Sequence, residues 1–223
     1  MNLLAIDTAL EACSVAVARD GEPPVIASET IGRGHAERLF GMIDAAMAEA
    51  GIVYAGLDRI AVTIGPGSFT GLRVGIAAAR GLALVIGCPV VGVGTLAVLA
   101  AEARDIVGPL PVLATLDARR GEVYAQLFDG DGRATGEPDA GPPSVIAGRL
   151  AAETRIAGSG AALVAAAYGQ GAESRIVAIS ATPDMASLVA IGLAAPPPAA
   201  PPRPLYVRAP DARPQSSAAV ERR

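Results

Sequence analysis

Short apolar segments separated by turn residues open the sequence and predict strands. Residues 3–6 form an apolar run that ends at Asp7, and residues 13–18 are small and β-branched residues followed by a turn at Gly21. A third segment of this kind covers residues 25–31. Because the connections between the three are short, we predict an antiparallel meander.

From residue 36 the apolar positions follow a helical period. Leu39, Ile43 and Met47 recur at every fourth position, and Gly51 marks the end of a predicted helix over residues 36–50. The same criteria predict strands over residues 59–64 and 89–93 and helices over residues 70–86 and 95–104. Three strands followed by alternating helices and strands form one ribonuclease-H-like lobe.

A second, weaker series of elements follows. The predicted strands cover residues 112–117, 122–128, 155–157 and 176–178, with one more left open near Arg133, and the predicted helices cover residues 144–152, 161–168 and 184–193. Residues 130–143 are rich in glycine, proline and aspartate and are expected to be irregular. We therefore predict an α/β protein with two lobes, residues 1–104 and a smaller, diverged lobe of residues 105–195, each a mixed sheet flanked by helices.

The sequence beyond the second predicted lobe is rich in proline. Residues 196–204 are expected to be extended chain, because they cannot form a helix or a central strand. Residues 196–223 are therefore predicted to be a largely disordered tail. Residues 205–208 are a small apolar island within it, for which docking against the lobes stays open as an alternative.

Composition and charge exclude several classes of function. Charged residues make up 18% of the chain and the net charge is −4, so the basic surface of a protein that binds nucleic acid on its own is not expected. Cys13 and Cys88 lack the spacing of a metal site or a disulfide framework, which predicts a reducing, cytoplasmic environment. Residues 81–101 carry no charge, but the glycines and proline within them predict helix, strand and helix and argue against a membrane span.

The most distinctive local feature is a glycine-rich turn, Gly65-Pro66-Gly67-Ser68, between a predicted strand and a predicted helix. Glycines at such a turn allow backbone N–H groups at the helix N-terminus to bind an anion, and Ser68 can cap the helix. However, no lysine follows and the spacing of a dinucleotide site is absent. A tight turn without a ligand is therefore favoured over vestigial nucleotide contacts at Gly65, Gly67 and Ser68.

Asp7 and Thr8 at the end of the first predicted strand are further candidate nucleotide contacts. Actin-like and Hsp70-like ATPases place an aspartate near metal and phosphate at this point. An ordinary turn-forming aspartate is the alternative, and no second acidic metal position is evident. The turn of residues 158–160 in the second lobe could pack against an adenosine, or it could simply separate a strand from a helix.

His35 is the only histidine, and it lies at the start of the predicted helix over residues 36–50. A pair of metal ligands on one helical face would need a ligand four residues on, where the sequence has Leu39. A single histidine also argues against Ser-His-Asp or Cys-His machinery. We therefore expect no catalytic residue and no metal site in this chain.

The predicted helix over residues 70–86 is apolar on nearly every face. Gly71, Gly75 and Ala79 recur at every fourth position, which lets another helix approach closely. A helix with this composition is either internal or shared with another subunit.

Five segments together resemble the TsaB (YeaZ) family. They are LLAIDTALEACSVAV (3–17), GHAERL (34–39), IGPGSFTGLRVGIAAARGLA (64–83), LDARRGEVY (116–124) and PLYVR (204–208). They extend over nearly the whole chain in the family's order, and the third is long and specific. The resemblance implies a two-lobed fold of the actin, Hsp70 and sugar-kinase superfamily.

The resemblance also implies a function. The family takes part in making N6-threonylcarbamoyladenosine beside the anticodon of tRNAs that read codons beginning with A. A paralogue, TsaD, carries the metal and the transfer chemistry, and an ATPase, TsaE, joins the pair. The chain is then expected to be a non-catalytic partner and activator of TsaD, to form a homodimer when alone, and to reach tRNA only through the complex. Any ATP is expected at the interface of that complex, and none on this chain alone.

The family pairs through its first two helices in a helical bundle, here residues 36–50 and 70–86. The interface candidates are therefore exposed positions among Leu39, Ile43, Met47, Arg73, Ile76 and Arg80. Two alternatives stay open. One is an independent ATP-dependent enzyme or glycoprotease-like hydrolase of the same superfamily, and the other is a plain homodimeric interaction module.

Overall fold

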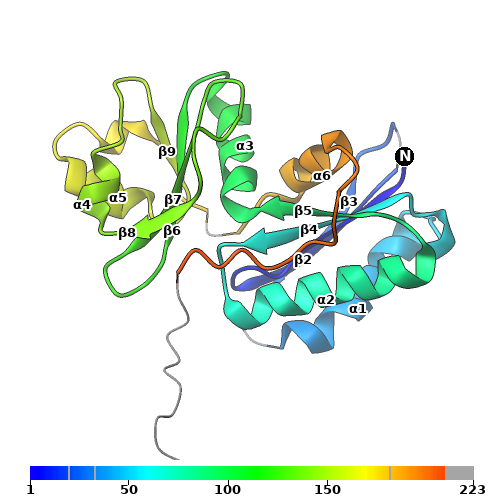
Figure 1. Ribbon diagram of the computed structural model, residues 1–223. Helices are drawn as coiled ribbons and strands as arrows, with labels where there is room; N and C mark the ends of the chain where they lie inside the picture. The colour runs from blue at the N-terminus through cyan, green and yellow to red at the C-terminus, as the bar shows by residue number, and fades with distance from the viewer. Residues whose placement is uncertain (20, 33, 181, 209–223) are drawn as a thin grey trace, which may run out of the picture.

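Two five-stranded sheets, each covered by helices, make up the two lobes of the protein (Figure 1). The computed structural model describes residues 1–208 except residues 20, 33 and 181. The first sheet has the strand order β3-β2-β1-β4-β5 and the second has the order β10-β9-β6-β7-β8.

The first sheet contains the predicted antiparallel meander and two parallel strands. Its strands are β1 (Leu3–Asp7), β2 (Ala12–Ala18), β3 (Val25–Thr30), β4 (Arg59–Gly65) and β5 (Val90–Gly94). β1 lies at the centre, antiparallel to β2 and parallel to β4. Its side chains alternate between the faces: Leu4 and Ile6 belong to the core under α1 and α2, whereas Leu3 and Ala5 belong to the core under α6.

Three helices enclose the first sheet. α1 (His35–Glu49) and α2 (Phe69–Ile86) cover one face, and α6 (Met185–Ala194) covers the other (Figure 1). Among the described residues, α2 is the one helix long and apolar enough to cross a membrane by length and composition. A helix of a soluble core passes the same test, and α2 buries one side against the sheet.

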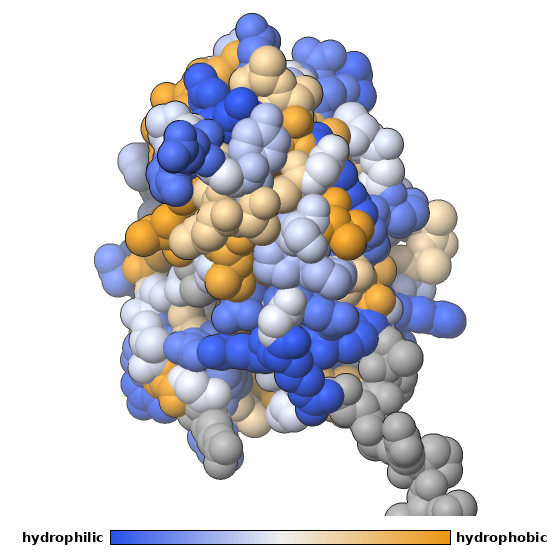
Figure 2. All heavy atoms as spheres, turned by 90° about the vertical axis from the view of Figure 1, so that its left-hand side faces the viewer, coloured by the Kyte–Doolittle hydropathy of each residue, from blue (hydrophilic) through white to orange (hydrophobic). Residues whose placement is uncertain are grey.

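The second sheet has helices on both faces. Its strands are β6 (Val112–Asp117), β7 (Val123–Phe128), β8 (Asp139–Gly141), β9 (Arg155–Ala157) and β10 (Ile176–Ala178). α4 (Pro143–Ala147) and α5 (Ala161–Tyr168) pack on one face, and α3 (Thr95–Val107) packs on the other, between the lobes. Short 3-10 helices occur at Tyr54–Gly56 and Glu173–Arg175. On the outer surface of this lobe, small apolar and polar patches lie side by side (Figure 2).

The last helix lies elsewhere than its sequence position suggests. The predicted division assigned residues 184–193 to the second lobe, yet α6 packs on the first sheet. Gly192 permits this approach, because a Cβ atom there would lie 2.7 Å from the Cβ of Ala61. The buried Arg59 guanidinium donates hydrogen bonds to the carbonyls of Gly192 (2.8 Å) and Ala195 (2.6 Å) at the end of α6.

Two further differences concern segments expected to be irregular or disordered. β8 forms within residues 130–143, because Asp139–Gly141 pairs with β7. Residues 196–208 contain no helix or strand. Leu205 donates a backbone hydrogen bond to Ile64, so this part of the expected disordered tail is held against the first lobe, which was the alternative left open for residues 205–208. Residues 209–223, also expected to be disordered, lie outside the described residues.

Replacing Arg59 should weaken the attachment of α6. Arg59→Met keeps the aliphatic stem but leaves the carbonyls of Gly192 and Ala195 without their charged donor, so we expect the free energy of unfolding to fall by about 2 kcal/mol. Urea denaturation measures this change. Arg203→Met, at an exposed position, is the matched control and should leave the stability unchanged. Equal effects of the two substitutions would contradict this role of Arg59.

Candidate functional site

The glycine-rich turn connects β4 to α2, and some of its backbone N–H groups already donate hydrogen bonds within the protein. Ser68 caps α2, and its hydroxyl accepts a hydrogen bond from the N–H of Gly71 at 3.3 Å. The N–H of Ser68 donates to the carbonyl of Ala9 at 2.6 Å. Two of the N–H groups that an anion could use at this helix start are therefore already bonded within the protein.

The glycines of the turn allow α2 to approach the end of β1 closely. A Cβ atom at Gly67 would collide with the carbonyl oxygen of Ala9, and one at Gly71 with that of Thr8. Thr8 also donates its hydroxyl proton to the carbonyl of Gly71 at 2.7 Å. The row of small residues continues at Gly75, which lies against the Thr8 hydroxyl, so it faces the chain's own sheet and not another helix.

Asp7 lies beneath this contact and is fully buried. Its Oδ1 accepts hydrogen bonds from the Thr63 hydroxyl at 2.6 Å and from the N–H of Ala9 at 3.1 Å, whereas Oδ2 has no partner among the described atoms. Burial raises the pKa of Asp7 to about 6, although the bonds from Thr63 and Ala9 and the nearby His35 lower it in part. With Asp7 and Thr8 buried, neither side chain presents surface to a phosphate or a metal ion.

A cleft of about 500 Å³ opens between the lobes beside the turn. Gly67, Ser68 and Glu11 line it from the first lobe, and Asp117 and Arg119 are among the lining residues of the second. Among the described residues of the lining, Arg119 is the one cationic side chain, and it forms an ion pair with Glu11 at 3.4 Å. Two carboxylates with one already paired arginine fit a triphosphate poorly, since anion sites usually present unpaired donors.

The predicted absence of a metal pair can be examined on α1. His35 is mostly buried, and its Nε2 lies 3.1 Å from the carbonyl oxygen of Leu10. Leu39, one turn further, is part of the core under the first sheet. Within the described part of the chain, no group of three or more histidine, cysteine, aspartate or glutamate residues could hold a metal ion.

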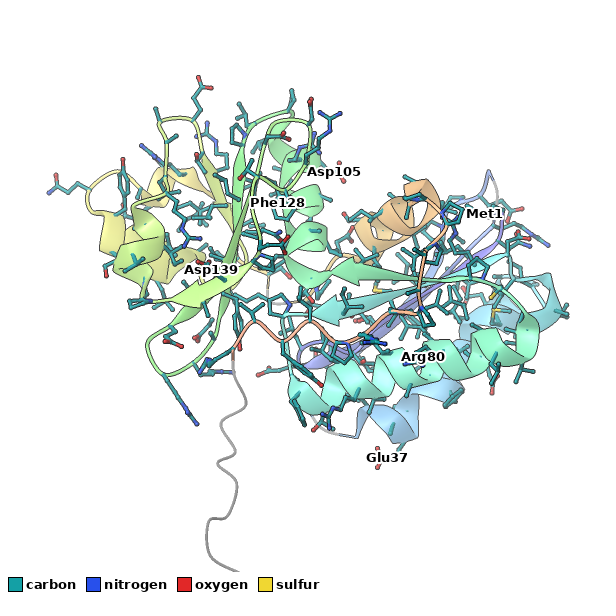
Figure 3. All side chains as sticks on the ribbon, in the orientation of Figure 1. Met1, Glu37, Arg80, Asp105, Phe128 and Asp139 are labelled. Atoms are coloured by element: carbon teal, nitrogen blue, oxygen red, sulfur yellow. The ribbon has the colours of Figure 1, made fainter. Side chains whose placement is uncertain are left out.

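Four of the six interface candidates are core residues. Leu39, Ile43, Met47 and Ile76 are buried between the helices and the first sheet. The interface was predicted at the exposed positions among the six, and these four are not exposed. Arg73 and Arg80 are exposed on α2, and Arg80 is visible beside the C-terminal segment (Figure 3). The helical period located the apolar face of α1 correctly, but that face contacts the sheet.

The exposed apolar residues of α1 and α2 were not identified as interface candidates from the sequence. Leu84 and Val85 on α2 expose 86% and 87% of their surface, and Phe40 on α1 exposes 49%. A groove of about 440 Å³ runs between the helices, and its lining is almost entirely apolar. Its lining residues are Phe40, Tyr54, Ala77, Ala78, Gly81, Leu82, Val85 and Ile86. The sequence pattern indicated Gly71, Gly75 and Ala79 as the side that another helix approaches. Had this side been predicted to face the sheet, the exposed side of α2 that carries Leu84 and Val85 would have been predicted as the free surface.

Comparison with known proteins identifies the family. The family model "TsaD: tRNA N6-adenosine threonylcarbamoyltransferase" matches residues 23–147. The chain is 44% identical over 131 residues to the tRNA threonylcarbamoyladenosine biosynthesis protein TsaB of Escherichia coli, an alignment covering 59% of this chain and 56% of that protein. It is 42% identical over 124 residues to the TsaB of Haemophilus influenzae, covering 56% and 52%. The chain thus matches about half the length of these curated relatives.

A solved structure extends the match. YeaZ from Pseudomonas aeruginosa superposes with a TM-score of 0.69 at 36% identity, covering 86% of this chain and 92% of that one. The chain belongs to the TsaB (YeaZ) family, whose curated members are named for threonylcarbamoyladenosine biosynthesis. The family resemblance and the two-lobed α/β fold class predicted from the sequence are confirmed.

The close approach of α2 to β1 can be tested with two glycines of the same helix. Gly71→Ala places a methyl group against the Thr8 carbonyl, so we expect a loss of about 1–3 kcal/mol in the free energy of unfolding. Gly81→Ala meets no atom within 4 Å and should stabilise the helix by up to about 1 kcal/mol. Urea denaturation of both variants measures the difference. The packing argument fails if Gly71→Ala is tolerated as well as Gly81→Ala.

The raised pKa of Asp7 predicts a pH dependence of stability. Below pH 3.8 the carboxyl group is protonated in both the folded and unfolded states; as the pH rises through about 6, the folded protein must ionise a buried group. The stabilising contribution, about 3 kcal/mol, is therefore lost over this window. Asp7→Asn removes the titration, so the stability of the wild type relative to the variant should fall between pH 4 and pH 6.5.

Denaturation midpoints at several pH values provide the measurement for this prediction. Asp105→Asn, an exposed substitution on α3, is the matched control and should parallel the wild type at every pH (Figure 3). Parallel profiles for the wild type and Asp7→Asn would show that Asp7 ionises normally.

Proposed function

We propose that this member of the TsaB (YeaZ) family is a non-catalytic subunit that binds and activates a TsaD-type transferase. The product of that transferase is N6-threonylcarbamoyladenosine, beside the anticodon of tRNAs that read codons beginning with A. The observation that carries the proposal is the exposed apolar surface of α1 and α2, in which Phe40 and Val85 line the groove and Leu84 is the exposed neighbour of Val85 in the chain.

The chemistry of this surface favours a protein partner. Two adjacent aliphatic side chains with more than four-fifths of their surface in solvent are costly unless something covers them. α1 and α2 lie side by side on one face of the sheet, so a partner can add two helices and complete a four-helix bundle. The groove between them would receive side chains from such a helix.

The remaining parts of the proposal follow from the same surface. In the absence of the transferase, a second copy of this chain can cover the groove, which gives a homodimer. Arg73 and Arg80, both exposed on α2, would belong to the polar rim of the interface. A TsaE-type ATPase would join the pair, and tRNA and any ATP would be bound by the assembly in the cytoplasm.

The geometry around the turn supports a division of labour. Asp7 is buried and bonded internally, and Leu39, four residues after His35, lies in the core at the position where a second metal ligand on this helical face would be needed. The transfer chemistry is therefore assigned to the partner. An independent ATP-dependent enzyme or glycoprotease-like hydrolase would need the cleft between the lobes to bind its substrate, and the lining of that cleft argues against a nucleotide.

Charged substitutions on the exposed surface should separate the subunits. The double variant Leu84→Glu, Val85→Glu places two carboxylates in the apolar interface, so we expect the dissociation constant with the TsaD-type paralogue of the same organism to rise at least about 30-fold. The monomer should stay folded, because both side chains are exposed. Calorimetric titration of the purified proteins measures the affinity, and mass spectrometry of bulk tRNA measures the modification in cells that carry only the variant.

Ile179→Glu is the matched control for this experiment. Ile179 is an aliphatic residue of the second lobe with 70% of its surface exposed, and its substitution should leave both affinity and modification unchanged. Wild-type affinity of the double variant would rule out the proposed interface. Normal modification in cells that lack the protein would rule out the proposed role as a whole.

A further inference from the structure

We propose that residues 204–208 (PLYVR) form a clasp that holds the two lobes at a fixed separation. This segment is one of the five that resemble the family. None of its own residues belongs to the proposed partner surface, and it meets that surface only at Arg73 of the rim. Figure 1 shows the C-terminal segment running from α6 along the first lobe and ending at the second. The inference does not depend on the proposed transferase partner.

The clasp is attached to the first lobe at the glycine-rich turn. The N–H of Leu205 donates to the carbonyl of Ile64 at 2.7 Å, at the end of β4. Gly65, with a φ of +117°, makes room for it, because a Cβ atom there would lie 2.8 Å from the carbonyl oxygen of Leu205. Leu205 is thereby held against the backbone at the end of β4 by one backbone hydrogen bond.

The next residue of the clasp is anchored on the first turn of α2. The ring of Tyr206 stacks on that of Phe69, with 5.3 Å between the ring centroids. The Tyr206 hydroxyl accepts a hydrogen bond from Nε of Arg73 at 2.9 Å, and the Arg73 guanidinium lies 3.7 Å from the centroid of the Phe69 ring. The stacking and the cation–π contact both hold the Tyr206 ring against the start of α2.

The end of the clasp contacts the second lobe. Arg208 donates a hydrogen bond to the carbonyl of Ala118 at 2.5 Å, and its Nε lies 3.5 Å from the Glu122 carboxylate. Its guanidinium also lies 5.8 Å from the centroid of the Tyr124 ring. Arg208 is thus joined to the turn between β6 and β7 through Ala118 and Glu122, and to the start of β7 through Tyr124.

This turn is a well-defined anchor because its backbone is tightly constrained. Arg119 and Arg120 have left-handed φ values of 63° and 57°, and Gly121 follows at 77°. The N–H of Ala118 donates to the carbonyl of Glu122 at 3.0 Å and closes the turn. Non-glycine residues hold such conformations only where the surrounding structure fixes them.

The clasp adds to the packing of α3 between the lobes, where Val98 belongs to the core under α6 and Leu99 belongs to the core of the second sheet. The chain crosses between them at the junction of β5 with α3 and again before α6, and such connections permit hinge motion. The Glu11–Arg119 ion pair also bridges the cleft, but both side chains are more than two-thirds exposed, so it contributes little. Ala118, Arg119 and Tyr124 line the cleft, so the clasp also determines how far the cleft opens.

The test measures the distance between the lobes directly. Spin labels are attached to cysteines introduced at two exposed positions, Val53→Cys in the first lobe and Ala166→Cys in the second. The partly exposed Cys88 is replaced by serine so that it is not labelled. Pulsed electron paramagnetic resonance then measures the distance between the labels. In the parent protein we expect one narrow distance distribution. Tyr206→Ala combined with Arg208→Ala should broaden it and shift it to longer distances. Arg203→Ala, one residue before the clasp, should leave it as in the parent.

An unchanged distribution in the folded double variant would overturn the proposal. If circular dichroism shows that this variant is unfolded, Arg208→Gln alone takes its place, since it removes the contact with the second lobe and keeps the first. A broadened distribution in Arg208→Gln supports the clasp, and a narrow one identical to that of the parent overturns it.

Discussion

The contact on which the rest of the structure depends is the close approach of α2 to the end of β1. Thr8 and Ala9 present carbonyl oxygens where the helix passes, and glycines at positions 67 and 71 leave no side chain in the way. This approach buries Asp7 beneath the turn and takes up the Ser68 N–H group. The glycine-rich turn is therefore a packing contact between α2 and β1, and the side chains of Asp7 and Thr8 are buried within it.

The same contact determines which side of α2 remains free. A helix that is apolar all round must bury both sides or leave one exposed. Since the row of small residues faces the sheet, the larger residues Leu84 and Val85 face solvent. The sequence left open whether α2 is internal or shared with another subunit. The structure combines the two, because one side of α2 is buried against the sheet and the other is exposed.

Local patterns predicted the elements of the first lobe, since period and turn residues act over short distances. They could not assign α6 to its sheet, because that depends on Gly192 and Arg59, which meet across 133 residues of sequence. They could not separate core from surface on α1 either. Leu39, Ile43 and Met47 form a regular apolar face, and periodicity defines such a face without saying what it contacts. The exposed Leu84 and Val85 lie in a continuous apolar run, where no polar neighbour marks the solvent side.

The glycine-rich turn also connects the two parts of the molecule that the proposals concern. α2 begins at this turn with Phe69, and the clasp rests on the same residues through Leu205 and Tyr206. A displacement of the start of α2 would therefore also displace Arg208 and the turn of the second lobe, because Tyr206 and Arg208 are only two residues apart. The clasp contacts the first turn of α2 through Tyr206 and the turn of the second lobe through Arg208, so it connects the helix that carries the proposed partner surface with the cleft.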